Sequence, residues 1–419
     1  MIPVRPLESF AIDRESVVEG TTFDACRAIV DDVRRRGDAA VREFARRFDR
    51  SDRADFEVTP GEWESATVPA ELLAAIRSVY ERIAEFHRRG LVRDFEYSPE
   101  PGVVVGTRVV PFERAGIYVP GGLAVYPSSL CMAAAAANVA GVPEVILCTP
   151  PDARGAVPEV MLATARICGI ARAFGVGGAQ AIGAMAYGTE TVPACEIVVG
   201  PGNRYVTAAK KAVAGDVAID FLAGPTEILV LSDGTVDPSF VAADLVAQSE
   251  HDAAACALLV TTSADHAEAV NRELERQTLA APRSSIIQAA LRTHGAILVA
   301  KDLESAVAFV NRFAPEHLVL ATGGPRDLLP RIRHAGAVFL GAYAPVAIGD
   351  YGSGPNAILP TLGEARRRSG LTANAFLKTI TYEELTEAGL RTLAPAALAL
   401  ASAEGLPAHR RSIEIRHER

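Results

Sequence analysis

Two pairs of polar residues in this chain have the types and spacing that enzyme chemistry uses. Gln248 and His251 lie three residues apart near the end of a predicted helix, so both side chains can approach one metal ion. Glu316 and His317 follow a proline and could act as a base with a partner acid. Taken alone, each pair is more often an exposed polar pair or a solvated loop, so both interpretations stay open at this point.

Two further segments carry candidate residues. Asp350 lies in the Gly/Pro-rich stretch 349–363, which is too long for a simple connection and therefore predicts a functional loop. A lone aspartate in such a loop usually caps a turn. Glu404 and His409 lie on either side of Gly405 near the C-terminus, where a helix end followed by a polar tail is the simpler interpretation.

Two glycine-rich turns occur where predicted strands meet predicted helices. The turn 200–203, Gly-Pro-Gly-Asn, precedes a helix whose free N–H groups could bind a phosphate. The turn 175–180 follows a strand but has Gln180 where the dinucleotide fingerprint requires its third glycine. The standard fingerprint is therefore absent. These residues by themselves indicate a ligand-binding α/β protein that could hold a metal on nitrogen and oxygen ligands.

The elements that must position these residues alternate between short apolar runs and helical patterns up to about residue 340. The predicted strands are Glu144–Cys148, Ala171–Val176, Glu196–Val199, Glu227–Leu231, Ala257–Thr261, Ala296–Ala300 and Ala337–Leu340. This alternation predicts parallel, doubly wound sheets, and seven strands favour two α/β domains over one. Before and after them we expect an extended arm, two helices, a β-rich stretch and a C-terminal helix, at 1–15, 22–48, 69–88, 103–119 and 382–404.

Composition and charge limit the class of protein. The chain has 419 residues, 49% of them hydrophobic and 22% charged, as in ordinary globular proteins. Its net charge of −9 argues against nucleic acid as a partner. The six cysteines form no CxxC pair and most lie in apolar runs, which indicates free thiols in a reducing compartment. No signal peptide or membrane span is recognisable, so we expect a soluble cytoplasmic protein without a membrane partner.

Taken together, a series of segments resembles the histidinol dehydrogenase family. The matching segments are ERAGIYVPGG (113–122), YPSS (126–129), VGGAQAI (176–182), AYGTE (186–190), VGPGN (199–203), DFLAGPTEILV (220–230), ADLVAQSEHD (243–252), FAPEHL (313–318), GAVFLG (336–341), GDYGSGPN (349–356), LPT (359–361) and EGLPAH (404–409). They extend over nearly the whole chain, and their combination is specific although no single segment is.

The resemblance implies a role for eleven residues. The zinc ion, one per subunit, would be held by Gln248, His251, Asp350 and His409. The acid–base pair would be Glu316 and His317. Contacts with the substrate would come from Thr226, Gln248, His251, His317, Asp350, Glu404 and His409. NAD would contact Tyr118, Gln180 and Asn203.

The reaction that the resemblance implies is a two-step oxidation of L-histidinol through L-histidinal to L-histidine, the last step of histidine biosynthesis. Two NAD molecules are used in turn, and zinc fixes the position of the substrate. His317 would take the hydroxyl proton, and Glu316 would activate a water on the bound aldehyde. No cysteine adduct is required, in agreement with cysteines that lie in apolar runs.

The resemblance also implies a fold of two Rossmann-like doubly wound domains in a domain-swapped homodimer. An N-terminal arm (1–15) would precede a first α/β domain built from 16–117 and 228–365. The second, NAD-binding domain would be 118–227. A helical C-terminal segment, 366–419, would cross to the partner subunit and complete its active site with Glu404 and His409.

The chain departs from the family pattern at a few positions, which keeps alternatives open. It has Thr226 where serine is usual, Ala357 where histidine is usual, and a basic run, Arg366–Arg368. Ala344-Pro345-Val346 also lacks the glutamate often found there. A related zinc- and NAD-dependent enzyme that oxidises another small polar alcohol, such as a sulfonated diol, is the first alternative. The second is a zinc-binding homologue without activity, which the intact acid–base pair argues against.

Overall fold

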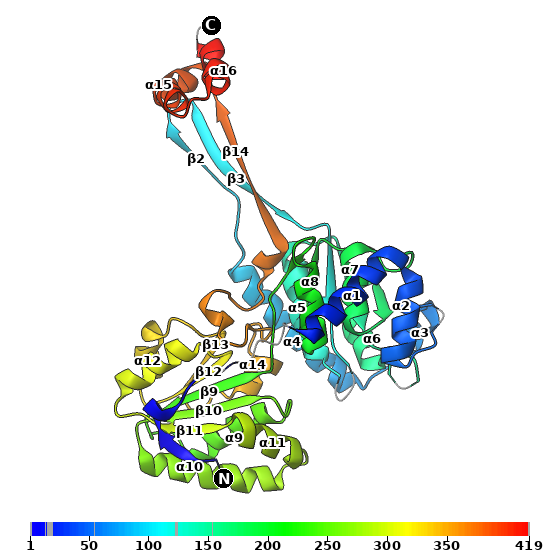
Figure 1. Cartoon of the computed structure of the whole chain (residues 1–419), viewed down its shortest axis with the longest axis vertical. Coiled ribbons are helices and arrows are strands. Elements are labelled where there is room, and N and C mark those ends of the chain that lie inside the picture. Colours follow the sequence, from blue (N-terminus) through cyan, green and yellow to red (C-terminus); the bar gives the residue numbers. More distant parts are fainter. Residues whose placement is uncertain are drawn as a thin grey trace. The chain divides into compact units, whose positions relative to one another are not determined.

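A computed structural model describes residues 2–12, 14, 20–53, 55–121, 125–152 and 154–417 of the chain. These residues divide into two units. The first consists of Met1–Arg89 and Glu113–Phe376, and the second of Gly90–Phe112 and Leu377–Arg419. The first unit contains two parallel sheets, and the second contains one antiparallel sheet (Figure 1).

The larger parallel sheet, which we call sheet A, has six strands. In spatial order they are β1 (Val4–Pro6), β11 (Ala296–Val299), β10 (Cys256–Thr261), β9 (Glu227–Ser232), β12 (His317–Ala321) and β13 (Ala337–Leu340). Its flanking helices are α9 (Pro238–Ser249), α10 (Ala264–Ala280), α11 (Ser284–His294) and α12 (Leu303–Phe313). Ile228 and Val230 pack towards α9, α10 and α11, whereas Leu229 and Leu231 pack towards α12. Because both faces are covered, the strands are continuous apolar runs.

The second parallel sheet, sheet B, has five strands. Their order is β6 (Arg172–Gly175), β5 (Glu144–Thr149), β4 (Arg114–Tyr118), β7 (Ile197–Val199) and β8 (Ala218–Ile219). Its helices include α5 (Pro127–Ala140), α6 (Glu159–Ile167), α7 (Gly178–Tyr187) and α8 (Arg204–Val213). The chain starts at β4, moves outward through β5 and β6, and then crosses back to β7. Sheet A has the same crossover between β9 and β12, so each sheet has a topological switch point.

The N-terminal helices pack on sheet B, which corrects the predicted domain boundary. α1 (Thr21–Arg36) lies beside α7 and α8, and α2 (Asp38–Phe44) packs on α7 (Figure 1). A single π-helical turn, η2 (Ala45–Asp49), follows α2. Val30 and Val33 of α1 join the core of sheet B, because Gly183 of α7 leaves room for them. The prediction that 16–117 joins 228–365 is therefore wrong for these helices. It is also wrong for β4, which is a strand of sheet B.

The second unit also differs from the prediction of a helical segment over 366–419. Its sheet has the antiparallel order β14 (Leu377–Leu385), β3 (Val103–Pro111) and β2 (Phe95–Glu100). Two helices follow, α15 (Glu387–Ala403) and α16 (Pro407–His417), and Thr386 caps the first. The C-terminal segment thus begins with a strand. Residues 366–376 belong to the first unit.

Most predicted elements are confirmed. All seven predicted strands are present, and the predicted helix 69–88 is α4 (Ala70–Arg89). The predicted helix 22–48 is interrupted at Gly37, which has φ 55°. Part of the arm 1–15 is ordered as β1, the edge strand of sheet A. Gly122, the last residue of the matching segment 113–122, lies outside the described residues.

The first unit also contains the short α-helices α3 (Pro60–Ser65), α13 (Pro325–Leu328) and α14 (Val346–Tyr351). Asp350 therefore lies on a helix, not in the loop that the Gly/Pro-rich sequence predicts. Within the described residues, no helix combines the length and apolar character that crossing a membrane requires.

Candidate functional site

Glu316 and His317 lie at the amino-terminal edge of sheet A. His317 is the first residue of β12, and β12 pairs in parallel with β9 so that His317 lies opposite Ile228. Thr226 directly precedes β9 and therefore reaches the same edge. α9 connects two parallel strands and must run back against them, which brings Gln248 in its last turn to this edge as well.

Three of the predicted residues form a chain of hydrogen bonds, and the His317 imidazole lies beside its carboxylate. Glu316 Oε2 accepts hydrogen bonds from Thr226 Oγ1 at 2.6 Å and from the Glu227 backbone N–H at 2.7 Å. Gln248 Nε2 donates to Thr226 Oγ1. His317 Nδ1 lies 3.4 Å from Glu316 Oε2. Thr226 thus links the amide of Gln248 to the carboxylate of Glu316.

The orientation of His317 is determined by its Nδ1 atom. Nδ1 lies 3.0 Å from the carbonyl oxygen of Glu227, which can only accept, so Nδ1 carries the proton. Nε2 is buried and has no hydrogen-bond partner among the described residues. Burial lowers the pKa of His317, but the neighbouring carboxylate of Glu316, with a smaller contribution from Asp350, raises it to about 9. Because Nδ1 is engaged with Glu227, Nε2 is the ring atom that remains available to exchange a proton with a substrate.

Asp350 and His251 extend this group of residues. Burial raises the pKa of Asp350, and the imidazoles of His317 and His251 partly offset that effect, which shows that the carboxyl group lies near both histidines. The amide oxygen of Gln248, the imidazole of His251 and the carboxylate of Asp350 are a donor set that zinc accepts. In the described part of the chain, no three His, Cys, Asp or Glu side chains form a metal site. One further ligand is needed.

Glu404 and His409 belong to the second unit. Glu404 is the C-cap of α15, His409 lies in the first turn of α16, and both side chains are exposed. The structure thus brings together Thr226, Gln248, Glu316 and His317 in the first unit, with Asp350 beside His317. It describes Glu404 and His409 separately from them.

The three predicted NAD contacts lie around the carboxyl ends of the sheet B strands. Tyr118 ends β4, and its hydroxyl accepts a hydrogen bond from the Gly178 N–H at 3.1 Å. Asn203 caps α8 by accepting hydrogen bonds from the N–H groups of Tyr205 and Val206. Tyr118 and Asn203 flank the switch point between β4 and β7, where open α/β sheets bind ligands.

Gln180 lies further along the same edge, in the first turn of α7. Its side chain is buried, and Nε2 donates to Asp49 Oδ2 at 3.1 Å. The same oxygen of Asp49 accepts a hydrogen bond from the Gly177 N–H at 3.1 Å. Asp49 therefore anchors Gln180. Sequence reasoning missed Asp49, since nothing in the helical pattern of 22–48 distinguishes it from an exposed acid.

A buried ion pair fixes the turn that leads to Asn203. Lys210 and Asp220 form a salt bridge with side chains only 3% and 0% exposed. Lys210 Nζ donates to the carbonyl oxygen of Gly200 at 3.0 Å, and Asp220 Oδ2 accepts from the N–H of Gly200 at 2.8 Å. Gly200 has φ 124°, and a Cβ there would overlap the carbonyl of Tyr118. Lysine inside an apolar helical stretch was the available signal in the sequence.

A second ion pair supports the acid–base pair from behind. Arg14 Nη2 lies 3.0 Å from the buried Glu227 carboxylate, and its guanidinium lies 4.0 Å from the centre of the Phe313 ring. Burial raises the pKa of Glu227 to about 7, and Arg14 partly counters this effect. Because the backbone of Glu227 bonds both Glu316 and His317, the Arg14 contact also holds the acid–base pair in place.

The positions that depart from the family pattern make structural contacts. Arg367 pairs with Glu364, Arg368 lies 3.7 Å from the same carboxylate, and Arg366 donates to the carbonyl of Arg312. The basic run is thus engaged with Glu364 and with main-chain oxygen.

Ala357 follows an anchor between this loop and two helices. Asn356 Nδ2 donates to the Met132 carbonyl oxygen in α5 at 3.0 Å and lies 3.2 Å from Nε2 of His87 in α4. The Ala357 N–H lies 3.2 Å from the Met132 sulfur. The loop is therefore held by Asn356 in the absence of the usual histidine.

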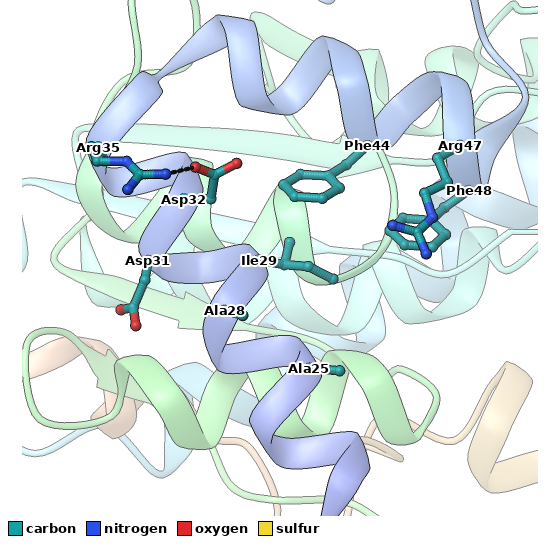
Figure 2. A pocket seen from close by; sticks show the side chains of 9 residues that line it. All are labelled: Ala25, Ala28, Ile29, Asp31, Asp32, Arg35, Phe44, Arg47 and Phe48. Carbon is teal, nitrogen blue, oxygen red and sulfur yellow. Dashed lines mark hydrogen bonds and ion pairs between the residues drawn. The ribbon is translucent and has the colours of Figure 1, made fainter.

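A hollow of about 470 Å³ lies elsewhere, between α1 and the residues of α2 and η2 (Figure 2). Its lining residues are Ala25, Ala28, Ile29, Asp31, Asp32, Arg35, Phe44, Arg47 and Phe48. None of the predicted site residues is among them.

Comparisons with known proteins identify the family of the chain. The family model described as histidinol dehydrogenase matches residues 12–417. A relative named histidinol dehydrogenase from Gluconobacter oxydans is 45% identical over 96% of this chain and 94% of its own, and one from Rhizobium meliloti is 46% identical over 98% and 95%. A crystal structure of histidinol dehydrogenase from Elizabethkingia anophelis matches with a TM-score of 0.93 and 35% identity, over 99% of this chain and 97% of that one. The chain belongs to the histidinol dehydrogenase family.

Proposed function

We propose that this protein oxidises L-histidinol through L-histidinal to L-histidine, with two NAD molecules per turnover. The observation that carries the proposal is the hydrogen-bonded chain Gln248–Thr226–Glu316, with the imidazole of His317 3.4 Å from its carboxylate and Asp350 nearby. It combines an oriented imidazole, a carboxylate and metal-type donors at one sheet edge. NAD supplies the hydride acceptor for both oxidations, and zinc supplies an anchor for the amine and imidazole of the substrate.

His317 and Glu316 take different protons. In the first oxidation the carbinol O–H proton goes to His317 Nε2 while the C–H bond breaks and its hydride goes to NAD, which leaves the aldehyde. In the second, water adds to the aldehyde carbon, Glu316 takes one proton of that water, and His317 Nε2 returns its proton to the carbonyl oxygen, which gives the hydrate. The hydrate then loses a hydride to the second NAD and its hydroxyl proton to His317, which leaves the acid. Nδ1 is committed to Glu227, so Nε2 is the atom that turns over protons.

Gln248, His251 and Asp350 would hold the zinc, with His409 as the fourth ligand. The chemistry of the first three donors supports this assignment, because one imidazole nitrogen and two oxygens lie beside the acid–base pair. Gln248 Nε2 donates to Thr226, which points the amide oxygen away from Thr226 and makes it the atom that can bind a metal. Glu404 would bind the amine of the substrate.

We infer that His409 and Glu404 act in the site of a second copy of the chain. The second unit supports this inference because its two segments, of 23 and 43 residues, are too few to build a core that usually suffices alone. Apolar side chains on β2, β14 and α15 are exposed, among them Phe95, Tyr97, Ile380 and Leu400. A homodimer would cover such a surface.

Complementation tests the shared site. His251→Ala and His409→Ala should each be inactive alone. In a mixed dimer, one site receives the intact His251 body and the intact His409 tail, and the other site carries both lesions. Re-association of equal amounts should recover about a quarter of wild-type activity, because half of the dimers are mixed and each has one working site of two. No recovery, with exchange of subunits shown by mass spectrometry, would contradict the shared site.

A substrate panel tests the reaction itself. NADH formation should be measured with L-histidinol, L-histidinal and sulfonated diols. The engaged arginines of 366–368 favour histidinol over the alternative of an anionic alcohol, because their charge is already partnered by Glu364 and by backbone oxygen. A clear preference for a non-imidazole alcohol would overturn the assignment. Absence of NADH formation with every substrate would instead favour the inactive homologue.

A further inference from the structure

We propose that Asp49 determines cofactor specificity and makes this chain prefer NAD to NADP. This inference rests on the proposed use of NAD. It goes further by naming the part of the cofactor that the protein recognises. That part is the 2′ position of the adenosine ribose, which carries a hydroxyl in NAD and a phosphate in NADP.

The order of the strands in sheet B indicates where the adenosine half would lie. Tyr118 and Asn203 flank the switch point between β4 and β7, whereas Gln180 follows β6, on the far side of β5. Three strand spacings separate β7 from β6, about 14 Å. A dinucleotide that contacts all three residues must therefore lie across the carboxyl ends of the strands, with one half over β7 and the other over β5 and β6.

Asp49 places a carboxylate at the β5–β6 end of this path. Its Oδ2 atom accepts hydrogen bonds from Gly177, which follows β6, and from Gln180. A Cβ on Gly177 would lie 2.7 Å from Asp49 Oδ1 and 2.7 Å from the Cβ of Pro150, the residue after β5. Gly177 therefore allows a close approach. The half-buried carboxylate lies against the ends of both strands although it comes from η2, outside the sheet.

This is the position at which doubly wound nucleotide-binding domains use an acid. In such domains an Asp or Glu after the second strand binds the ribose 2′-hydroxyl of NAD. Here the second strand, β5, is followed by Pro150 and Pro151, and the next acid, Asp152, is engaged with Arg154 of its own turn. Asp49 thus supplies from another segment the carboxylate that the strand end lacks.

The nearby arginine is already fully occupied. Arg53 lies beside the end of β6, where a Cβ on Gly175 would be 3.5 Å from its Cδ. Its five N–H groups donate to both oxygens of Glu62 and to the carbonyl oxygens of Asp55, Glu57 and Gly155. A 2′-phosphate, which carries about −1.5 to −2 charges at pH 7, would meet the Asp49 carboxylate, and Arg53 has no N–H group left to balance it.

The carboxylate therefore favours one cofactor by attraction and rejects the other by repulsion. The 2′-hydroxyl can donate a hydrogen bond to Asp49, whereas a phosphate is repelled by it at short range. Asp49→Asn keeps the shape and one oxygen acceptor for Gly177 and removes the charge. Asp49→Ser also removes volume, which makes room for the phosphate.

The test is the ratio of the dissociation constants for NADP and NAD, measured by calorimetric titration of the purified full-length protein. The wild type should bind NAD more tightly than NADP by at least a hundredfold. Asp49→Asn and Asp49→Ser should each reduce this ratio at least tenfold, and the ratio of kcat/KM values should move in the same direction. Asp52→Asn is the matched control, because its side chain is 92% exposed and pairs with Arg46, and the ratio should not change.

Other outcomes would overturn the proposal. If both variants fold, as judged by circular dichroism, and weaken NAD and NADP equally, then Asp49 only positions Gln180 and does not select the cofactor. The same holds if the Asp52 variant changes the ratio as much. If the wild type binds NAD tightly but shows no preference over NADP, the specificity inference fails while the proposed function stands. If the wild type binds neither, the proposed function fails first.

Discussion

Replacing Lys210 by Met should lower the free energy of unfolding by about 3 to 5 kcal/mol. The change leaves Asp220 charged, with its side chain fully buried and without its cation. It also removes the donor to the carbonyl of Gly200. An exposed ion pair would contribute about 1 kcal/mol at most. The size of the measured loss therefore distinguishes an ion pair that supports the turn 200–203 from one that contributes little to stability.

The chain offers a direct probe and a matched control. Its single tryptophan, Trp63, lies on α3, which packs on α6 of the sheet B layer, so its fluorescence during urea unfolding reports on the part that contains Lys210. Lys211→Met changes the neighbouring, half-buried lysine and should alter stability by about 0.5 kcal/mol or less. The double variant Lys210→Met/Asp220→Asn should lose less than Lys210→Met alone, because no unpaired buried charge remains.

The same substitution has a consequence for cofactor binding. Because the pair holds both polar groups of Gly200, a loosened turn should raise the KM for NAD more than it lowers kcat. A loss of stability under 1 kcal/mol for Lys210→Met would refute the argument. The argument would also be refuted if the losses of stability caused by Lys210→Met and by Asp220→Asn simply added in the double variant.

Three further predictions follow from the site and the packing around it. Glu316→Gln should slow the oxidation of histidinal at least tenfold more than the first hydride transfer from histidinol, because only the oxidation of histidinal needs an activated water. Stopped-flow measurement of NADH formation checks this prediction, and equal slowing of both steps would count against it. Chelation should abolish turnover and zinc should restore it, and full activity in protein shown by elemental analysis to be metal-free would disprove the metal assignment. Burial lowers the pKa of His87 to about 4, so between pH 6.5 and 4 the unfolded chain binds a proton that the folded chain does not. The free energy of unfolding should therefore fall by about 1 to 2 kcal/mol from pH 7 to 5. Urea midpoints of the wild type and His87→Gln measure this, and the slope should be shallower in the variant.

Most strands of the two parallel sheets could be predicted from the sequence, because strands buried on two faces read as uninterrupted apolar runs. β8, which has two residues, was not predicted, and neither was β12. Its run begins with a histidine after a proline and a glutamate, so it reads as a polar loop. Only pairing with β9 shows that His317 starts a strand and that Thr226 lies within reach of Glu316.

Contacts between distant segments could not be predicted in this way. α1 has an ordinary amphipathic pattern, and nothing in it specifies α7 and α8 as its neighbours; the space above Gly183 does so in the folded chain. β14 is exposed along almost its whole length, so it lacks the apolar signal of a buried strand. Asp49 and Asp220 look like any other acids until their partners are known.

The pairing of β14 with β3 has a consequence for the order of events during synthesis. The paired residues are between 266 and 282 positions apart, from Pro111 with Leu377 to Val103 with Leu385. At about 5 to 20 residues per second, the ribosome needs about 15 to 55 s to synthesise the chain between a residue of β3 and its partner in β14. β1 waits in the same way for β11, whose first paired residue is Ile297. The nascent chain thus holds two unpaired strand edges for most of its translation, and chaperone capture or premature association of nascent chains would act in that interval.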